Sequence, residues 1–160
     1  MELVDVVDAH DRPVAVAPRA EVRARNLRHR VVFVIVDGSD GRILVHRRAE
    51  RKDVWPGWWD CAVGGVVAAG ETYAEAAERE LGEELGLAGQ PAEVGGGAYR
   101  DDDVDVVGRV YRLTHDGPFS FADGEIVEAR FVTRAELDAM LAELPFVPDT
   151  LAIARAAGAL

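Results

Sequence analysis

The alternation of apolar and polar positions divides the chain into short strands and a few helices. Residues 31–36 form a continuous run of valine, phenylalanine and isoleucine, which predicts a buried central strand. Turn-forming residues at 37–41 separate this run from residues 43–46, so we expect the two apolar segments to pair as a hairpin. Further strands are expected at residues 3–7, 14–17, around Tyr99, 104–113 and 126–132.

Two helices are predicted by their starting residues, a threonine followed three positions later by a glutamate. Thr72 and Glu75 begin the first helix, and Gly86 stands after its last turn, where glycine commonly ends a helix. Thr133 and Glu136 begin the second helix, which we expect to run to about residue 144. Two further helices are expected, one at residues 20–27 and one that Asp149 caps and that runs to residue 157.

The remaining segments are richer in glycine and tryptophan. We expect residues 55–70 to be largely irregular with short strands, and the three glycines at 95–97 to form a turn or loop. Hairpins mixed with separated helices predict an α+β fold with a mixed sheet between helices. No linker or repeat interrupts the 160 residues, so we expect a single domain, residues 1–160, with a sizeable core.

Charge limits the range of partners. The chain has 29 acidic residues against 18 lysines and arginines, a net charge of −11. Nucleic-acid-binding surfaces carry clustered basic charge, so we expect no nucleic-acid partner. A small phosphate-bearing substrate remains compatible, provided that something such as a divalent cation offsets the repulsion between the two anions.

Several features favour the cytoplasm. No apolar stretch approaches the length that spans a bilayer, so no membrane partner is expected. The first five residues lack a basic segment leading into an apolar run, which argues against a secretory signal. Cys61 is the single cysteine and has no internal disulfide partner.

The first capped helix carries an unusual group of acids. Glu80, Glu83 and Glu84 have the spacing i, i+3 and i+4, which places them on one helical face. Like charges at this spacing repel each other by a few tenths of a kcal/mol per pair. The cluster is therefore either a solvated face or a site for a hard cation such as Mg²⁺, which prefers oxygen ligands.

The residues around this cluster follow the pattern G-x5-E-x7-R-E-U-x-E-E-x-G-U, where U is a bulky aliphatic residue. Every fixed position is matched, by Gly65, Glu71, Arg79, Glu80, Leu81, Glu83, Glu84, Gly86 and Leu87. This segment resembles the Nudix box. The resemblance implies a Nudix-type α/β/α sandwich, and a hydrolase that cleaves a phosphoanhydride bond in a nucleoside-diphosphate-X or similar small diphosphate metabolite.

The resemblance also implies roles for individual residues. Mg²⁺, with Mn²⁺ as a substitute, would be held by Glu71, Glu80, Glu83, Glu84 and the carbonyl of Gly64. Arg79 would orient the glutamates through ion pairs. When bound, the metal would lower the pKa of a water molecule and orient the diphosphate. Glu80 or Glu83 would act as general base, or an acid from a distant loop: Asp101, Asp102, Asp103, Asp105, Glu125 or Glu128.

Two segments before the box supply candidate substrate contacts. Residues 46–52 are the densest basic stretch, and Arg47 is the candidate for binding a phosphate, the alternative being a solvated hairpin end. Three tryptophans follow at positions 55, 58 and 59. Trp55 is the candidate for the substrate pocket, whereas Trp58 or Trp59 is expected to pack under the sheet.

Residues 26–30 and 56–60 resemble a subgroup related to isopentenyl-diphosphate isomerase. Those isomerases carry Cys-Gly-His just before the helix, where this chain has Gly64, Gly65 and Val66, and Cys61 lies three residues too early. We therefore expect isomerase-like architecture with hydrolase chemistry. The isomerase activity and a non-catalytic, nucleotide-binding Nudix-like domain are the alternatives, although such domains usually lose box glutamates. The substrate, the number of metal ions and a homodimeric state stay open.

Overall fold

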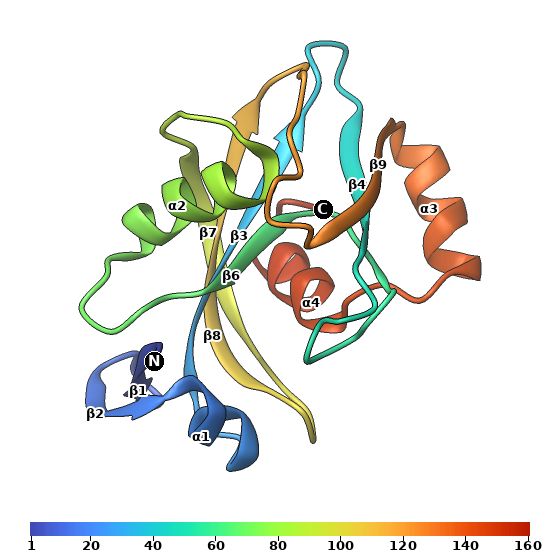
Figure 1. The fold of residues 1–160 in the computed structure, drawn as a ribbon. Helices are drawn as coiled ribbons and strands as arrows, with labels where there is room; N and C mark the ends of the chain where they lie inside the picture. The colour runs from blue at the N-terminus through green and yellow to red at the C-terminus, as the bar shows by residue number, and fades with distance from the viewer.

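A computed structural model describes all 160 residues (Figure 1). Nine strands form a mixed sheet, and helices cover it on both faces, as the sequence predicts. The strands are β1 (Leu3–Val7), β2 (Pro13–Pro18), β3 (His29–Asp37), β4 (Ile43–Arg48), β5 (Trp59–Asp60), β6 (Val63–Val66), β7 (Ala92–Arg100), β8 (Asp105–Thr114) and β9 (Ile126–Val132). The helices are α1 (Arg19–Ala24), α2 (Tyr73–Leu85), α3 (Arg134–Glu143) and α4 (Pro148–Ala156).

Strand β3 is the centre of the sheet. Along one edge it pairs in parallel with β8, from His29 opposite Val106 to Asp37 opposite Thr114. Along the other edge it pairs antiparallel with β6. Both faces of β3 are buried, which explains why its sequence is continuously apolar instead of alternating.

The predicted hairpin between residues 31–36 and 43–46 is wrong beyond its first pair. Only Asp37 and Ile43 pair across the turn, and β4 then leaves β3 to pair with β9 and β5. The reason is that β8 and β6 already occupy the two edges of β3. The divergence opens the sheet and separates β4 from β6.

The two faces of the sheet carry two cores. Val32 and Val34 pack with Leu81 and Leu85 of α2, whereas the intervening β3 residues pack in a second cluster that includes Ile153 of α4. In Figure 1, α2 and α4 lie on opposite sides of the central strands. Burial of each leucine of α2 contributes roughly 1.5–3 kcal/mol, which fixes the rotation of the helix and hence the direction of its acidic face.

Glycines 95–97 lie inside β7, not in a turn, so that prediction is wrong. A Cβ atom at Gly95 would lie 2.9 Å from the Cβ of Ala157, and one at Gly97 would lie 2.9 Å from the Cβ of Ala156. These glycines therefore allow the end of α4 to approach the strand closely.

The helix ends agree with the sequence in two cases and differ in two. The caps of α2 and α3 form as predicted, with Thr72 accepting from Glu75 N–H and Thr133 from Glu136 N–H. Helix α4 instead begins after Val147, so Asp149 lies within its first turn and does not cap it. Helix α1 ends at Ala24, short of the predicted residue 27. None of the helices combines the length and apolar character needed to cross a bilayer.

Candidate active site

Helix α2 presents its three clustered glutamates at graded depths. Glu84 is 5% exposed, and the side chains of Glu80 and Glu83 are 12% and 52% exposed. The helix phase explains this order, because the core residues Leu81 and Leu85 flank Glu84 and turn it toward β6. The acidic face is therefore not a uniformly solvated surface.

The carboxylate of Glu84 is buried with little compensation. It accepts one hydrogen bond, from the backbone N–H of Gly64 at 2.7 Å. Burial raises its pKa well above the ordinary value, and the neighbouring Glu80 raises it further. Burial also raises the pKa of Glu80, against the opposing effect of Arg79. Glu84 forms no ion pair, and a buried acid without a cation is costly, so a bound divalent cation would fit here.

Arg79 organises the other carboxylates. It donates to both oxygens of Glu71, at 2.8 and 2.9 Å, and to Glu80 Oε1 at 2.8 Å. Weaker bonds reach Glu83 at 3.2 Å and the Val66 carbonyl at 3.1 Å. Hydrogen bonds from Arg79 hold the pKa of Glu71 below its ordinary value although burial opposes them. Arg79 thus fixes the acids in place and ties the helix to the end of β6.

No three acidic, histidine or cysteine side chains converge as a ready-made metal site. The reason is that Arg79 engages oxygens of Glu71, Glu80 and Glu83. One oxygen of Glu80 and one of Glu84 remain free of hydrogen bonds, and both are hard oxygen donors of the kind that Mg²⁺ prefers. The donor set fits a divalent cation held mainly by these two residues.

Gly64 and Gly65 allow β6 to pass between β3 and α2. A Cβ atom at Gly65 would lie 2.5 Å from Glu80 Oε1, and one at Gly64 would overlap the carbonyl oxygen of Val32. Any side chain at either position would therefore displace the strand or the glutamate. The two glycines bring backbone within reach of the acids.

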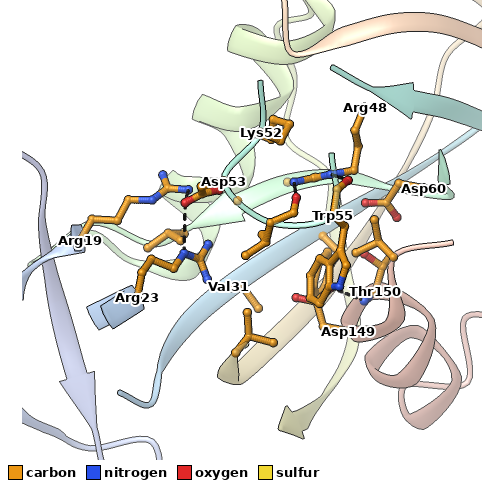
Figure 2. A pocket seen from close by; sticks show the side chains of 17 residues that line it. Arg19, Arg23, Val31, Arg48, Lys52, Asp53, Trp55, Asp60, Asp149 and Thr150 are labelled. Atoms are coloured by element: carbon orange, nitrogen blue, oxygen red, sulfur yellow. Dashed lines mark hydrogen bonds and ion pairs between the residues drawn. The ribbon is translucent and has the colours of Figure 1, made fainter. Parts of the chain in front are cut away.

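A pocket that is partly open to solvent lies against these glycines. Val31, Phe33 and Trp55 form apolar parts of its wall, and Gly64 and Gly65 join it to the acids of α2. Figure 2 shows the charged residues of its lining. Its cations are Arg19, Arg23, Arg48 and Lys52, and its acids are Asp53, Asp60 and Asp149.

The two candidate substrate residues are placed differently. Trp55 lines the pocket. Arg47 is absent from the lining and pairs with Glu128 at 3.6 Å and Glu50 at 3.9 Å. The next residue, Arg48, lines the pocket instead and donates to the Val54 carbonyl at 3.0 Å. As expected for one of the later tryptophans, Trp59 packs in the core.

Most of the distant acids have structural partners. Asp101 accepts from the backbone N–H groups of Asp103 and Val104 and so forms the β7–β8 turn. Asp105 pairs with Arg28 at 3.2 Å. Glu125 differs, because it lies 2.5 Å from the ammonium of Lys52, which lines the pocket.

No sequence pattern marked two of the pocket acids as candidate site residues. Asp60 and Asp149 are 5% and 6% exposed, although they lie about ninety positions apart in the chain. Burial raises the pKa of Asp60 to about 7 and that of Asp149 to about 6. Backbone hydrogen bonds join Trp59 of β5 to Pro145 and Val147, just before α4, and so bring the two acids to one pocket. Motif spacing could not have found a pair that depends on this long-range contact.

Comparisons with known proteins agree with this geometry. The NUDIX domain family model matches residues 27–151. YfcD of Escherichia coli K12, named as a Nudix hydrolase, is 41% identical over 151 residues, which cover 94% of this chain and 83% of YfcD. SCO1686 of Streptomyces coelicolor, also named as a Nudix hydrolase, is 43% identical over 155 residues, covering 94% and 84%. The chain belongs to the Nudix hydrolase family.

A solved structure extends the likeness to three dimensions. The crystal structure of DR0079 from Deinococcus radiodurans superimposes with a TM-score of 0.76 at 28% identity, and covers 91% of this chain and 92% of that chain. The MutT protein of Methanosarcina mazei, at 22% identity and a TM-score of 0.65 over 76% of this chain and 86% of its own, shares the fold.

Proposed function

We propose that this enzyme uses a divalent cation, Mg²⁺ or Mn²⁺, to hydrolyse a phosphoanhydride bond in a small diphosphate metabolite of the nucleoside-diphosphate-X type. One observation carries the proposal: Glu84 is buried beside Glu80 with one backbone N–H as its hydrogen-bond donor. A buried acid without an ion pair, such as Glu84, destabilises the fold, and such groups are found mainly at functional sites.

In this proposal Glu80 and Glu84 supply the main carboxylate ligands, with the Gly64 carbonyl beside them. Glu83, which is half exposed, would complete the set or act as base on the attacking water. Glu71 and Arg79 hold the ligands in place through their paired hydrogen bonds. A bound cation lowers the pKa of water and neutralises charge on the leaving phosphate.

The pocket cations support a phosphate-bearing substrate. Arg19 and Arg23 both pair with Asp53, at 3.6 and 3.3 Å, and Arg19 also pairs with Glu2 at 3.3 Å. Burial raises the pKa of Glu80 and Glu84, and Lys52 lies near enough to both to oppose part of that rise. The site therefore has positive charge beside the acids although the chain carries a net charge of −11. Arg47 remains a candidate for a more peripheral phosphate contact.

Isomerase chemistry of the Cys-Gly-His type is disfavoured by Cys61. Its side chain is fully buried in a hydrophobic cluster, and burial raises the pKa of its thiol. A buried, protonated thiol behaves as a small apolar group and cannot meet a substrate. A purely nucleotide-binding role is disfavoured because every box glutamate is present.

The proposal is tested by a screen of nucleoside diphosphates, nucleotide sugars, dinucleotides and isopentenyl diphosphate in Mg²⁺, with detection of released phosphate or nucleotide. We expect hydrolysis that a chelator abolishes and that added Mg²⁺ or Mn²⁺ restores, and no dimethylallyl product. Full activity after thorough chelation, or efficient isomerisation, would overturn it.

A further inference from the structure

One end of the pocket contains three buried polar side chains with unused hydrogen-bonding capacity. Asp60 accepts from Cys61 N–H at 2.8 Å, and Asp149 accepts from Thr150 N–H at 2.8 Å. Each bond uses one oxygen, and neither carboxyl group forms an ion pair within 4.0 Å. The hydroxyl of Thr150 is fully buried, lines the pocket beside Asp60 and makes no hydrogen bond within 3.5 Å.

Leaving a buried polar atom unpaired costs about 1–3 kcal/mol. The Thr150 hydroxyl is such an atom, and Asp60 and Asp149 each keep one oxygen that accepts no hydrogen bond. Structures rarely retain an unpaired buried group unless a ligand or water satisfies it. Here all three adjoin the same pocket, and Figure 2 shows Asp60, Asp149 and Thr150 gathered at the end opposite Arg19 and Arg23. The unsatisfied groups therefore point to a ligand that brings hydrogen-bond donors.

The neighbouring charges indicate what kind of donor fits. Arg48 acts on both Asp60 and Asp149 and opposes the burial effect on their pKa values. Arg23 also acts on Asp149, and Lys52 lines the same pocket. A positively charged group on a ligand would be repelled by these three side chains. A neutral amino group avoids that repulsion and still donates to the carboxyl oxygens.

The pocket wall indicates a flat ligand. Trp55 provides an aromatic surface, and Val31 and Phe33 provide apolar contacts. Trp55 has a left-handed backbone conformation with φ of 46°, which is uncommon for a bulky residue and often marks a functional position. The loop thus accepts local strain where the indole borders the pocket.

We propose that Asp60, Asp149 and Thr150 bind an amino-bearing planar heterocycle, such as an aminated nucleobase, as the part of the substrate beyond the diphosphate. This inference rests on the proposed function, since Gly64 and Gly65 connect the pocket to the acids that would act on the diphosphate. The cations Arg19, Arg23 and Lys52 then face the phosphates, and the buried acids face the ring.

The protonation state of the two acids decides how well they select an amino group. Burial raises the pKa of Asp60 to about 7 and of Asp149 to about 6, so both groups are mostly ionised only above about pH 7. An ionised carboxylate accepts hydrogen bonds and donates none, so it pairs with an amino group and not with a carbonyl oxygen. A protonated carboxyl group both donates and accepts and can pair with either edge, so the selection of an amino group comes from the ionised form.

The test compares ligands in which a carbonyl group beside a ring N–H replaces an amino group beside a ring nitrogen acceptor: ADP with IDP, and CDP with UDP. For the parent enzyme we expect kcat/KM to favour the amino member of at least one pair by roughly 10- to 100-fold. Calorimetry with AMP and IMP, or CMP and UMP, measures the same preference without turnover. A failure of hydrolysis alone would count against the proposed function and leave this binding test standing.

Three variants assign the preference to residues. Asp60→Asn, Asp149→Asn and Thr150→Val should each reduce the amino-over-carbonyl ratio, to about 3-fold or less for the aspartates. Asp53→Asn is the matched control, because it removes a carboxylate from the cationic end of the same pocket and should change both members of a pair equally. Circular dichroism checks that each variant folds. If an aspartate variant does not fold, the nearly isosteric Thr150→Val still tests the inference.

Two results would overturn the inference. One is equal affinity of the parent for both members of every pair. The other is an amino preference that persists in all folded variants of Asp60, Asp149 and Thr150, since the preference would then arise elsewhere.

Discussion

The acidic face of α2 and the pocket on the other side of β6 handle buried charge in opposite ways. On α2, one arginine engages three glutamates, and only Glu84 is left buried without an ion pair. In the pocket, four cations and three acids are spread over α1, the β4–β5 segment and α4, and two of the acids are buried without a cation contact. The first arrangement suits a fixed chemical step, and the second suits recognition of a varied group.

We expect the two regions to control different kinetic quantities, α2 the rate of hydrolysis and the pocket the choice of substrate. Residues on α2 should change kcat for every substrate, because they act on the diphosphate that all substrates share. Pocket residues should change the ranking of substrates. Variants in the two regions therefore test whether this division is real.

The largest effect is expected from Glu84→Gln, which keeps the size of the side chain but removes its charge. We expect kcat to fall by about 100-fold or more on any substrate that the parent hydrolyses, because charge stabilisation by the metal would be weakened. Glu78→Gln is the matched control, since Glu78 is an exposed glutamate on the same helix. Near-normal turnover by Glu84→Gln would remove this residue from the metal site.

Arg79→Ala should have a mixed effect. It leaves Glu71, Glu80 and Glu83 without their shared cation, so both rate and stability should fall. We expect roughly 10-fold in kcat and about 1–2 kcal/mol in the free energy of unfolding, since the guanidinium is partly exposed and solvent screens it. Chemical denaturation without metal measures the second quantity. Unchanged stability would mean that Arg79 does not hold the acids together.

Stability should respond to pH through Asp60. Its pKa is about 7 in the folded protein against an ordinary 3.8, so the folded state retains a proton that the unfolded state releases. The free energy of unfolding should therefore decrease as pH rises from about 4 to about 7. Asp60→Asn has no carboxyl group at this position and so escapes this decrease. The melting temperature of the variant minus that of the parent should therefore increase between pH 5 and pH 8. A difference that is constant with pH would contradict the raised pKa.

The smallest effect should come from Arg47. The structure pairs it with Glu128 and Glu50, whereas Arg48 lines the pocket. Arg47→Ala should change KM by about 2-fold or less, and Arg48→Ala should change it more. Steady-state kinetics on one substrate measures the change in KM for each variant. A larger change in KM for Arg47→Ala than for Arg48→Ala would make Arg47 the principal phosphate contact.

The sequence predicts a region well when the residues that determine its structure lie close together in the chain. The caps at Thr72 and Gly86 and the spacing of the glutamates lie within one short segment, so α2 and its acidic face could be predicted. The pairing of β4 could not, because it depends on which strands occupy the edges of β3.

The pocket depends on long-range packing in the same way. Asp149 resembles a helix cap in sequence, but Pro148 begins α4 one residue earlier and turns this aspartate into the interior. Glycines 95–97 resemble a turn, but they permit the contact between β7 and α4. No local pattern marks either role, since both are set by elements distant in the chain.

The central claim is that a divalent cation binds at Glu84 and Glu80, and Mn²⁺ binding followed by electron paramagnetic resonance tests it most directly. Titrations of the parent, Glu84→Gln and Glu78→Gln should show binding to the parent and to Glu78→Gln with similar affinity, and binding at least about 10-fold weaker to Glu84→Gln. Equal Mn²⁺ affinity in all three proteins would contradict the account.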